Sequence, residues 1–360
     1  MPPRKIPVSW DQKRVDDGIY DECAAQMKKM GAQALASAVL GEDFVSGMSE
    51  KGNVFYHEPG AEDVEARFNI IGEIVPLAMG TVLSARGNWF APNDPPTPMS
   101  DKDKVKDILV LRKPSLSTRA LTEIFEHQIG ALNEIREADE AEEQAQKKKV
   151  FVKEWLRSSA PNDITQPLDL ISVHMPLKYV VPPEPKKGPA VKTATAPRIT
   201  RKRPAVNLDD VDDHGPDSGT ASASSDTEIK LGAFYDPHLL YDFGGDFFGL
   251  NRAKLAQHDV QGMDGNLVPP FNYYEQLKPG TLVLINASLH CWIFGGANKV
   301  YQVHAHSVKI IASSDEPADF RDLPSLPVPR VDPSNTATPS KSKSSFSGFT
   351  ITPANKKARK

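Results

Sequence analysis

Residues Leu277–Ala312 read LKPGTLVLINASLHCWIFGGANKVYQVHAHSVKIIA. Lys278, Pro279 and Gly280 predict a turn, because proline presets φ and glycine accepts a positive φ. The apolar runs after this turn are rich in β-branched and aromatic residues and contain no helix cap, which favours strands. Gly295 to Asn298 then lets the chain reverse. The stretch therefore predicts a β-meander.

The second half of this stretch alternates between two kinds of side chain. Odd-numbered positions from Tyr301 to Ala305 are apolar or aromatic, and even-numbered positions from Gln302 to His306 are polar, as in a strand with one solvated face. We expect residues 229–323 to form a small, mainly-β domain, an OB-like or SH3-like barrel. Trp292 and Phe294 are expected in its core, because barrels fill their interior with such side chains.

Length and composition indicate a folded protein that also contains stretches without a core. The chain has 360 residues, enough for two domains of about 100–200 residues each. Its 31 prolines and its mean hydropathy of -0.41 are typical of a chain that cannot bury all of its length. The net charge of -4 indicates no partner by itself, although the charge is unevenly distributed.

Cysteine usage and hydropathy indicate the compartment. Cys23 and Cys291 lie too far apart in the sequence for a disulfide framework or a zinc-ligand pair, which favours a reducing compartment. No apolar run approaches the roughly 18 residues that cross a bilayer. Residues 1–6 also lack the apolar segment of a signal peptide. We therefore expect a soluble intracellular protein without a membrane partner.

Residues 1–180 combine helix and strand signals. Apolar side chains recur at helical spacing from Trp10 to Leu40, and a second helix is expected from Ser117 or Thr118 to about Lys148. Short apolar runs between glycine, proline and charged residues predict strands, namely 54–56, 68–71, 74–77, 81–83, 108–111 and 171–179. This region is expected to be an α+β domain, and the protein is expected to belong to the α+β class.

Two stretches lack the apolar residues of a folded core. Residues 181–228 are first proline-rich and basic and then acidic, and residues 324–360 are rich in Ser, Thr, Pro and Lys. Such segments bury too little apolar surface to offset the ordering entropy, which is roughly 1–2 kcal/mol per residue for the backbone alone. We predict a disordered linker and a disordered basic tail. Alternatively, the linker is a long insertion within one composite domain.

Both of these stretches carry basic clusters that are typical of nuclear localisation signals. An import receptor requires cationic patches on an exposed backbone. The candidate residues are Lys186, Lys187, Arg198, Arg201, Lys202 and Arg203 in the linker and Lys356, Lys357, Arg359 and Lys360 in the tail. The predicted partner is a nuclear import receptor, and the predicted location is the nucleus, with the cytoplasm as second choice. Alternatively, the clusters keep the chain soluble or contact phosphates without specificity.

No motif in the sequence indicates an enzyme. Residues 244–249 lack the lysine and the spacing of a phosphate loop, and no nucleophile motif accompanies the acid–histidine neighbours Asp236 and His238. Potential zinc ligands lie close together near the C-terminus: His290, Cys291, His304 and His306. They lack the usual ligand spacing, and the histidines are interpreted as polar-face side chains. We expect a non-enzymatic protein without a cofactor or a metal.

The predicted barrel suggests a binding function. An OB-like sheet binds single-stranded nucleic acid by stacking bases on aromatic side chains beside cations. Lys299, Tyr301 and Lys309 are the candidate binding residues. The leading hypothesis is a nuclear protein that binds nucleic acid or a chromatin-associated partner through this β domain. The alternative is a protein–protein interaction adaptor without nucleic-acid contact, and a salt-sensitive affinity for a single-stranded oligonucleotide would distinguish the two.

Several segments of the C-terminal region also carry a resemblance. They are Asp236–Phe243, Gln257–Val260, Pro269–Pro270, Leu277–Val283, Leu289–Trp292 and Tyr301–Lys309. Through them the chain resembles a group of uncharacterised proteins of mushroom-forming (basidiomycete) fungi, over roughly the last third of its length before the tail. That group has no assigned activity, so the resemblance implies a source and no mechanism.

Overall fold

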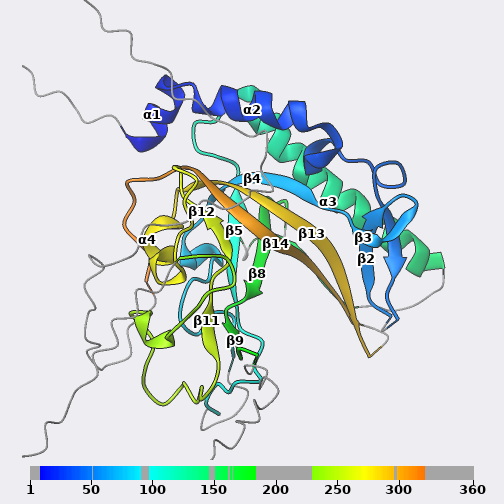
Figure 1. The fold of residues 1–360 in the computed structure, drawn as a ribbon. Coiled ribbons are helices and arrows are strands. Elements are labelled where there is room, and N and C mark those ends of the chain that lie inside the picture. Colours follow the sequence, from blue (N-terminus) through cyan, green and yellow to red (C-terminus); the bar gives the residue numbers. More distant parts are fainter. Residues whose placement is uncertain are drawn as a thin grey trace, which may run out of the picture.

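The computed structural model describes residues 9–50, 52–90, 97–145, 151–160, 163, 165–183, 229–295 and 298–320. Figure 1 shows helices packed on the outside of a strongly curved sheet. The α-helices are α1 (Trp10–Asp16), α2 (Ile19–Met30), α3 (Arg119–Ala145) and α4 (Tyr273–Gln276). Short 3-10 helices are η1 (Gly31–Gln33), η2 (Leu35–Ser37), η3 (Leu77–Met79), η4 (Pro237–Leu239) and η5 (Pro270–Asn272). The predicted α+β class is confirmed.

The strands form a large sheet and a small one. The large sheet contains β1 (Val45–Met48), β2 (Val54–Glu58), β3 (Ala61–Glu65), β4 (Phe68–Ile74), β5 (Lys106–Arg112), β6 (Phe151–Lys153), β7 (Leu156–Arg157), β8 (Leu170–Leu177), β12 (Asp259–Gln261), β13 (Leu282–Phe294) and β14 (Asn298–Ala312). The small sheet contains β9 (Tyr179–Val180), β10 (Phe234–Tyr235) and β11 (Lys254–Ala256).

Within the large sheet, β4, β5, β8, β13 and β14 close into a barrel. β4 pairs antiparallel with β5 and β13, β5 with β8, and β13 with β14. The parallel pairing of β8 with β14, at Val173 and Val303, completes the circle. Numbered along the chain, the order around the barrel is first, second, third, fifth, fourth and back to first. This is the strand order of an OB-fold and not that of an SH3-like barrel.

The barrel contains strands from both regions that the sequence analysis separated. β4, β5 and β8 lie before residue 181, whereas β13 and β14 lie after residue 228. One buried cluster includes Leu109 of β5 and Val303 of β14, and β9 shares the small sheet with β10 and β11. The expected separate second barrel is therefore corrected to one composite domain. Local patterns cannot reveal a pairing such as Ile70 with Ile285, because the partners are far apart in sequence.

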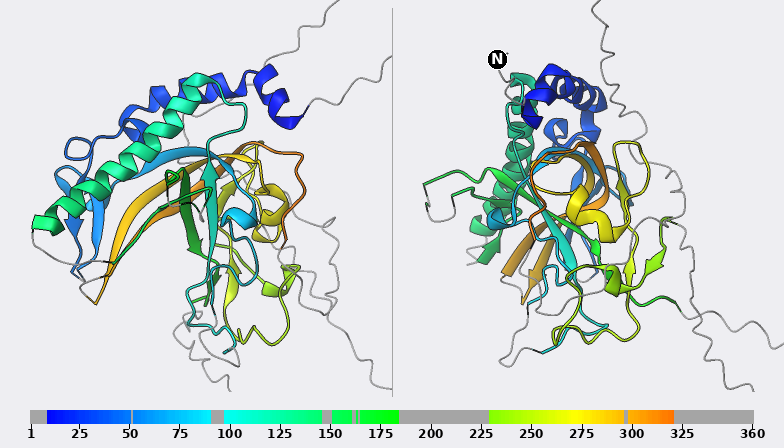
Figure 2. Two further views of the ribbon diagram at one scale, coloured as in Figure 1. Left: turned by 180° about the vertical axis from the view of Figure 1, so that it is seen from behind. Right: turned by 90° about the vertical axis from the view of Figure 1, so that its left-hand side faces the viewer.

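The expected meander is a single long hairpin. β13 and β14 are paired from Leu282, opposite Ala312, to Phe294, opposite Asn298. The register shifts after Leu282 and again between Asn286 and Ala287. A β-bulge of this kind increases strand twist without ending the ladder, which fits the curvature of the hairpin in Figure 2. Gly295, with a φ of 61°, begins the reversal where the sequence predicts it.

Helix α3 covers one face of the outer half of this hairpin (Figures 1 and 2). The helix buries an apolar face, since Phe125, Leu132 and Ile135 belong to the barrel cluster. The helix expected from Trp10 to Leu40 is instead divided into α1, α2 and two 3-10 turns. The break falls at Gly18, whose φ of 71° is left-handed and which therefore cannot continue a helix.

A buried ion pair fixes α1 to the barrel. The Arg14 side chain is 3% exposed and lies 3.3 Å from Glu73 of β4, which is 0% exposed. Arg112 of β5 binds the same carboxylate at 2.5 Å. Arg14 Nη2 also donates to the carbonyl oxygens of Gly280, Ala312 and Ser313. One guanidinium thus joins α1 to the chain just before β13 and to the end of β14.

Some sequence predictions concern residues outside the described ranges. Most of the predicted linker (184–228) and all of the predicted tail (324–360) fall there. Among the described helices, none is long and apolar enough to cross a membrane. Cys23 and Cys291 are both buried and are not joined by a disulfide.

Candidate functional site

Four flat side chains form a continuous row across three neighbouring strands of the barrel. His174 lies on β8, His304 on β14, and His290 and Trp292 lie on β13. The ring centroids of His174 and His304 are 6.3 Å apart, and those of His304 and His290 are 4.4 Å apart and stacked. His290 and Trp292 are 5.7 Å apart with planes 8° from parallel. We call this set the imidazole–indole row.

The row lies on the face of the hairpin opposite to α3. On β14, Tyr301, Val303 and Ala305 are buried against the core, whereas Gln302, His304 and His306 are half-buried. This alternation is the one that the sequence predicts. In Figures 1 and 2 none of the described helices packs on the row side of the hairpin's outer half. His290, Trp292 and His304 are half-buried, whereas His174 at the β8 end of the row is buried.

A hydrogen-bond network holds these rings in place. Gln302 Oε1 accepts from Trp292 Nε1 at 3.1 Å and lies 2.8 Å from His304 Nε2. Ser288 Oγ lies within 3.1 Å of the Nε2 atoms of both His290 and His306. Because the rings of Trp292, His290 and His304 are each tied to a polar partner, this part of the row is ordered before any ligand arrives.

Glu65, at the end of β3, reaches the same network. Its carboxylate lies 2.6 Å from His290 Nε2 and 3.4 Å from His306 Nε2. Burial raises the pKa of Glu65, but the hydrogen bonds from His290 and His306 outweigh burial and hold that pKa well below its usual range. Glu65 therefore stays ionised and fixes the orientation of both rings.

Two imidazoles of the row are neutral at physiological pH. Burial lowers the pKa of His174 to about 4, helped by the charges of Lys106, Lys153 and Arg157. Burial likewise lowers the pKa of His304 to about 2. Neutral rings present uncharged π-faces, and bases stack on such faces without sequence preference.

Cations lie on one side of the row. Lys106 of β5, Lys153 of β6 and Arg157 of β7 are close enough to His174 to lower its pKa. Lys153 pairs with Val300, which in turn pairs with Trp292, so this lysine lies across β14 from the indole. None of the three cations forms an ion pair with another described residue.

The structure places the sequence-predicted binding residues elsewhere. Tyr301 is 2% exposed, packs on Trp155 at 4.8 Å and donates its hydroxyl to Asp139 of α3. Lys299 is 8% exposed and lies 3.9 Å from the same Asp139. Both are on the covered face, so the prediction of an exposed Tyr301 platform beside Lys299 is wrong. Lys309 is half-buried further along β14, between Leu284 and Gln261.

The expectation for the other two aromatic residues is also corrected. Phe294 is 56% exposed at the end of β13, and Trp292 is half-buried in the row, so neither belongs to the core. A signal for the row was present in the sequence, since Ser288, His290 and Trp292 share one face of β13 at every second position. No local pattern linked them to His174 or to Lys153.

The potential zinc ligands do not converge. His290, His304 and His306 share the row side, but Cys291 points into the hydrophobic core on the opposite face. No group of three His, Cys, Asp or Glu side chains among the described residues is arranged to hold a metal ion. The predicted nuclear-localisation residues lie outside the described ranges.

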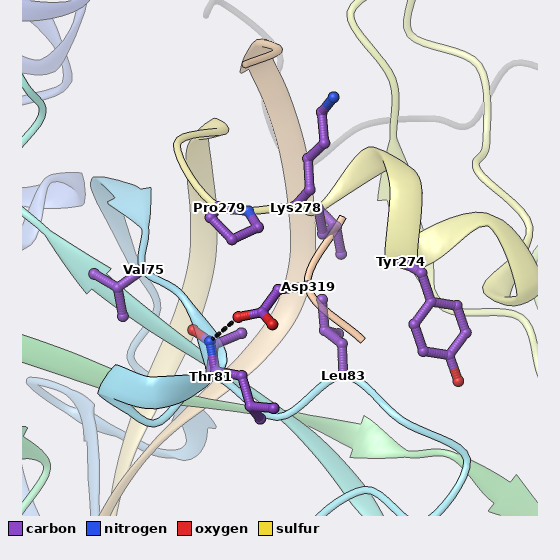
Figure 3. Close-up of a pocket in the computed structure, with 9 residues that line it drawn as sticks. Val75, Thr81, Leu83, Tyr274, Lys278, Pro279 and Asp319 are labelled. Atoms are coloured by element: carbon purple, nitrogen blue, oxygen red, sulfur yellow. Dashed lines mark hydrogen bonds between the residues drawn. The ribbon is translucent and has the colours of Figure 1, made fainter. Parts of the chain in front are cut away.

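A cavity near α4 is too small for a ligand. Figure 3 shows Asp319 pointing into it, with one carboxylate oxygen accepting from the Leu77 amide at 2.6 Å. Its volume is about 10 Å³, roughly the space that one water needs. This cavity is therefore not a candidate site.

Comparisons with known proteins found few matches. No protein-family model matches the chain, and no curated protein matches it. Among solved structures, the single-stranded DNA-binding protein from bacteriophage Enc34 in complex with ssDNA is similar with a TM-score of 0.29 and 11% identity, over 77% of this chain and 99% of that chain. A second structure of the single-stranded DNA-binding protein from bacteriophage Enc34 is similar with a TM-score of 0.29 and 11% identity, over 82% of this chain and 98% of that chain. At this TM-score the likeness carries no argument about fold or ligand.

Proposed function

We propose that this protein binds single-stranded nucleic acid along the imidazole–indole row and catalyses no reaction on it. The observation that carries the proposal is the row itself, in which four flat side chains stand in sequence across β8, β14 and β13. Unpaired bases stack on such rings, with about 1–3 kcal/mol per base lost on alanine substitution. A paired duplex keeps its bases stacked on one another and offers no such contact.

The charges beside the row support the same ligand. Lys106, Lys153 and Arg157 lie on the β8 side, where they would meet the phosphates of a strand whose bases face the row. Phosphate contacts supply most of the non-specific affinity for nucleic acid. The neutral His174 and His304 rings add no competing charge between the cations and the bases.

The position of the row in the barrel gives further support. OB-folds bind oligonucleotides on the face of their second and third strands and on the loops that flank it. Here those strands are β5 and β8, and the hairpin of β13 and β14 stands in place of the loop between the fourth and fifth strands. The row runs from β8 onto this hairpin.

The surroundings of the Ser288 hydroxyl support binding without catalysis. Ser288 Oγ contacts His290 and His306, as a nucleophile would contact a base. Ser288 is 0% exposed, however, and a nucleophile must reach the atom that it attacks. The network therefore serves to orient rings.

Fluorescence anisotropy of the full chain with a labelled oligothymidylate and with a matched duplex tests the proposal. We expect the single strand to bind more tightly than the duplex, with an affinity that falls with salt by a log–log slope of about -0.7 per phosphate contact. Equal affinity for the duplex, or an affinity that does not change with salt, would contradict stacking on the row. Absence of binding to oligothymidylate and to a mixed-sequence RNA would favour an adaptor without nucleic-acid contact.

The proposal includes residence in the nucleus, which rests on the sequence alone. The two basic clusters, at Lys186–Arg203 and Lys356–Lys360, have the charge that an import receptor recognises. A fluorescent fusion of the full chain should accumulate in nuclei. Replacement of Arg201, Lys202 and Arg203 by alanine should shift it toward the cytoplasm, and an unchanged distribution would reject this cluster as the signal.

A further inference from the structure

A cavity of about 550 Å³ lies on the side of the row away from the cations. Phe55 of β2 and Trp292 of β13 contribute aromatic rings to its wall, together with His290. Phe55 stands directly opposite His290 in the β2–β13 pairing, so the three rings line one continuous surface. The turn between β1 and β2 and the strand β3 form the remaining wall. We call this the acidic pocket.

The polar lining of the acidic pocket is dominated by carboxylates. Glu50, Glu62, Asp63 and Glu65 line it, with Ser49 and Asn53 as the neutral polar residues. Glu65 is engaged by His290 and His306. The side chains of Glu50, Glu62 and Asp63 form no hydrogen bond or ion pair with any other described residue. Three carboxylates thus face an aromatic-walled space without a described cationic partner.

This combination selects the sign of the ligand. A phosphate group would meet like charges, which disfavours extension of a bound nucleic-acid strand into the pocket. An ammonium or guanidinium group would meet opposite charges and the faces of Phe55 and Trp292, which attract cations through their π-electrons. The imidazole–indole row, with cations beside it, therefore favours an anionic ligand, whereas the acidic pocket favours a cationic one.

A bare metal ion does not fit this space. A metal needs several ligands within about 2.0–2.6 Å of one point, and no such group occurs among the described residues. The volume of about 550 Å³ corresponds instead to an organic ligand, since small-molecule and side-chain pockets measure about 300–1,000 Å³. The carboxylates are divided between β3 and the β1–β2 turn, which suits a ligand with more than one cation.

We propose that the acidic pocket binds a lysine- or arginine-rich peptide of a partner protein. One cationic side chain enters between the rings of Phe55 and Trp292, and neighbouring cations pair with Glu62 and Asp63. Charge complementarity commits the site to this occupant. The acidic pocket shares His290 and Trp292 with the row, but its carboxylates lie on β3 and on the β1–β2 turn, outside the row. Substitutions at Glu62 and Asp63 can therefore test peptide binding separately from nucleic-acid binding.

The test uses the full chain and a labelled peptide of alternating lysine and alanine, followed by fluorescence anisotropy. The variant E62Q/D63N removes two charges with almost no change of shape, and neither side chain has a described partner whose loss would affect folding. The matched control is D246N/E275Q, which removes two exposed carboxylates elsewhere on the surface. We expect E62Q/D63N to weaken peptide binding about tenfold, as the loss of two partly exposed ion pairs implies, and the control to bind as the wild type does.

Further outcomes separate this proposal from nucleic-acid binding and from self-occupancy. E62Q/D63N should bind oligothymidylate at least as well as the wild type. A loss of peptide binding in this variant can then be attributed to the acidic pocket and not to the nucleic-acid site. Peptide binding that is equal in E62Q/D63N and the wild type would overturn the proposal. Binding that appears only after Lys356, Lys357 and Lys360 are replaced by alanine would also overturn it, because the tail of this chain would then be the occupant.

Discussion

Trp292 and His290 lie on the same face of β13, with ring centroids 5.7 Å apart and planes 8° from parallel. The indole is also fixed by its hydrogen bond to Gln302. A base stacked on this pair would therefore cost no further ordering of the side chain. Truncation at Trp292 should expose how much the row contributes to binding.

Trp292→Ala is expected to weaken oligothymidylate binding by about 1–3 kcal/mol, the usual loss for one base–aromatic contact. Anisotropy titrations at fixed salt measure this directly. The matched control is Phe234→Ala, which removes a partly exposed aromatic side chain from the small sheet. Equal losses in the two variants would mean that the indole acts through folding and not through stacking.

Lys153→Ala should change the salt dependence of oligothymidylate binding more than the preference for a particular base sequence. Lys153 is exposed on β6 and lies across β14 from Trp292, where it would neutralise one phosphate. Removal of one phosphate contact to a single strand reduces the magnitude of the log–log salt slope by about 0.7. Titrations at several salt concentrations give this slope, with Lys29→Ala on the exposed side of α2 as the control. An unchanged slope would place the phosphates away from β6.

The face of the hairpin shows where sequence reasoning succeeds and where it fails. The alternation from Tyr301 to His306 correctly predicts which residues share a face, because side chains of a strand have a period of two. It does not tell which face a helix will cover. That choice depends on α3, whose Asp139 lies in the charged second half and nevertheless accepts the Tyr301 hydroxyl. A polar residue thus covers the aromatic one, and the expected platform is buried.

The closure of the barrel was beyond local patterns for a different reason. The short apolar runs at 68–71 and 108–111 are strands within β4 and β5, as predicted, and the run at 171–179 covers most of β8 and the first residue of β9. Their partners β13 and β14 follow the inserted residues 181–228, and the periodicity of one strand carries no information about such distant pairing. The row is assembled by this pairing, since His174 meets His304 only through the parallel contact of β8 with β14.

Tyr301→Phe should destabilise the protein without affecting its ligand. The hydroxyl of Tyr301 donates to Asp139 at 2.5 Å in a nearly buried position. Hydrogen bonds to charged groups contribute about 1.5–3 kcal/mol, so the free energy of unfolding should fall by about that amount. Urea unfolding measures the loss. Weaker oligonucleotide binding at unchanged stability would show instead that the hydroxyl reaches the ligand.

Glu73→Ala should lower the free energy of unfolding strongly, because Glu73 is a buried charged residue. It leaves the buried Arg14 guanidinium without its carboxylate and also removes the partner of Arg112. Breaking a buried pair by removing one member costs about 3–5 kcal/mol, which should appear as a lower midpoint of urea unfolding. The control is Glu123→Ala, which breaks the exposed pair with Arg119 on α3 and should leave the midpoint nearly unchanged. Similar midpoints for both variants would contradict a structural role for the Arg14–Glu73 contact.

His174 should make the stability of the protein sensitive to mild acid. Burial and the nearby charges of Lys106, Lys153 and Arg157 lower its pKa from 6.5 to about 4 in the folded state. Between these values the unfolded chain binds the proton and the folded chain does not. The contribution is therefore complete above about pH 6.5 and is lost as the pH falls toward 4, by about 3 kcal/mol in total.

His174→Gln should remove this part of the pH dependence. Urea unfolding at about pH 7 and about pH 5 should show a smaller loss of unfolding free energy in the variant than in the wild type, because glutamine takes up no proton in that window. His304 retains its own lowered pKa, so some acid sensitivity remains in the variant. The control is His127→Gln on the exposed side of α3, which should follow the wild type. If His174→Gln loses as much stability in acid as the wild type, His174 is not held neutral by its burial among β5, β8 and β14.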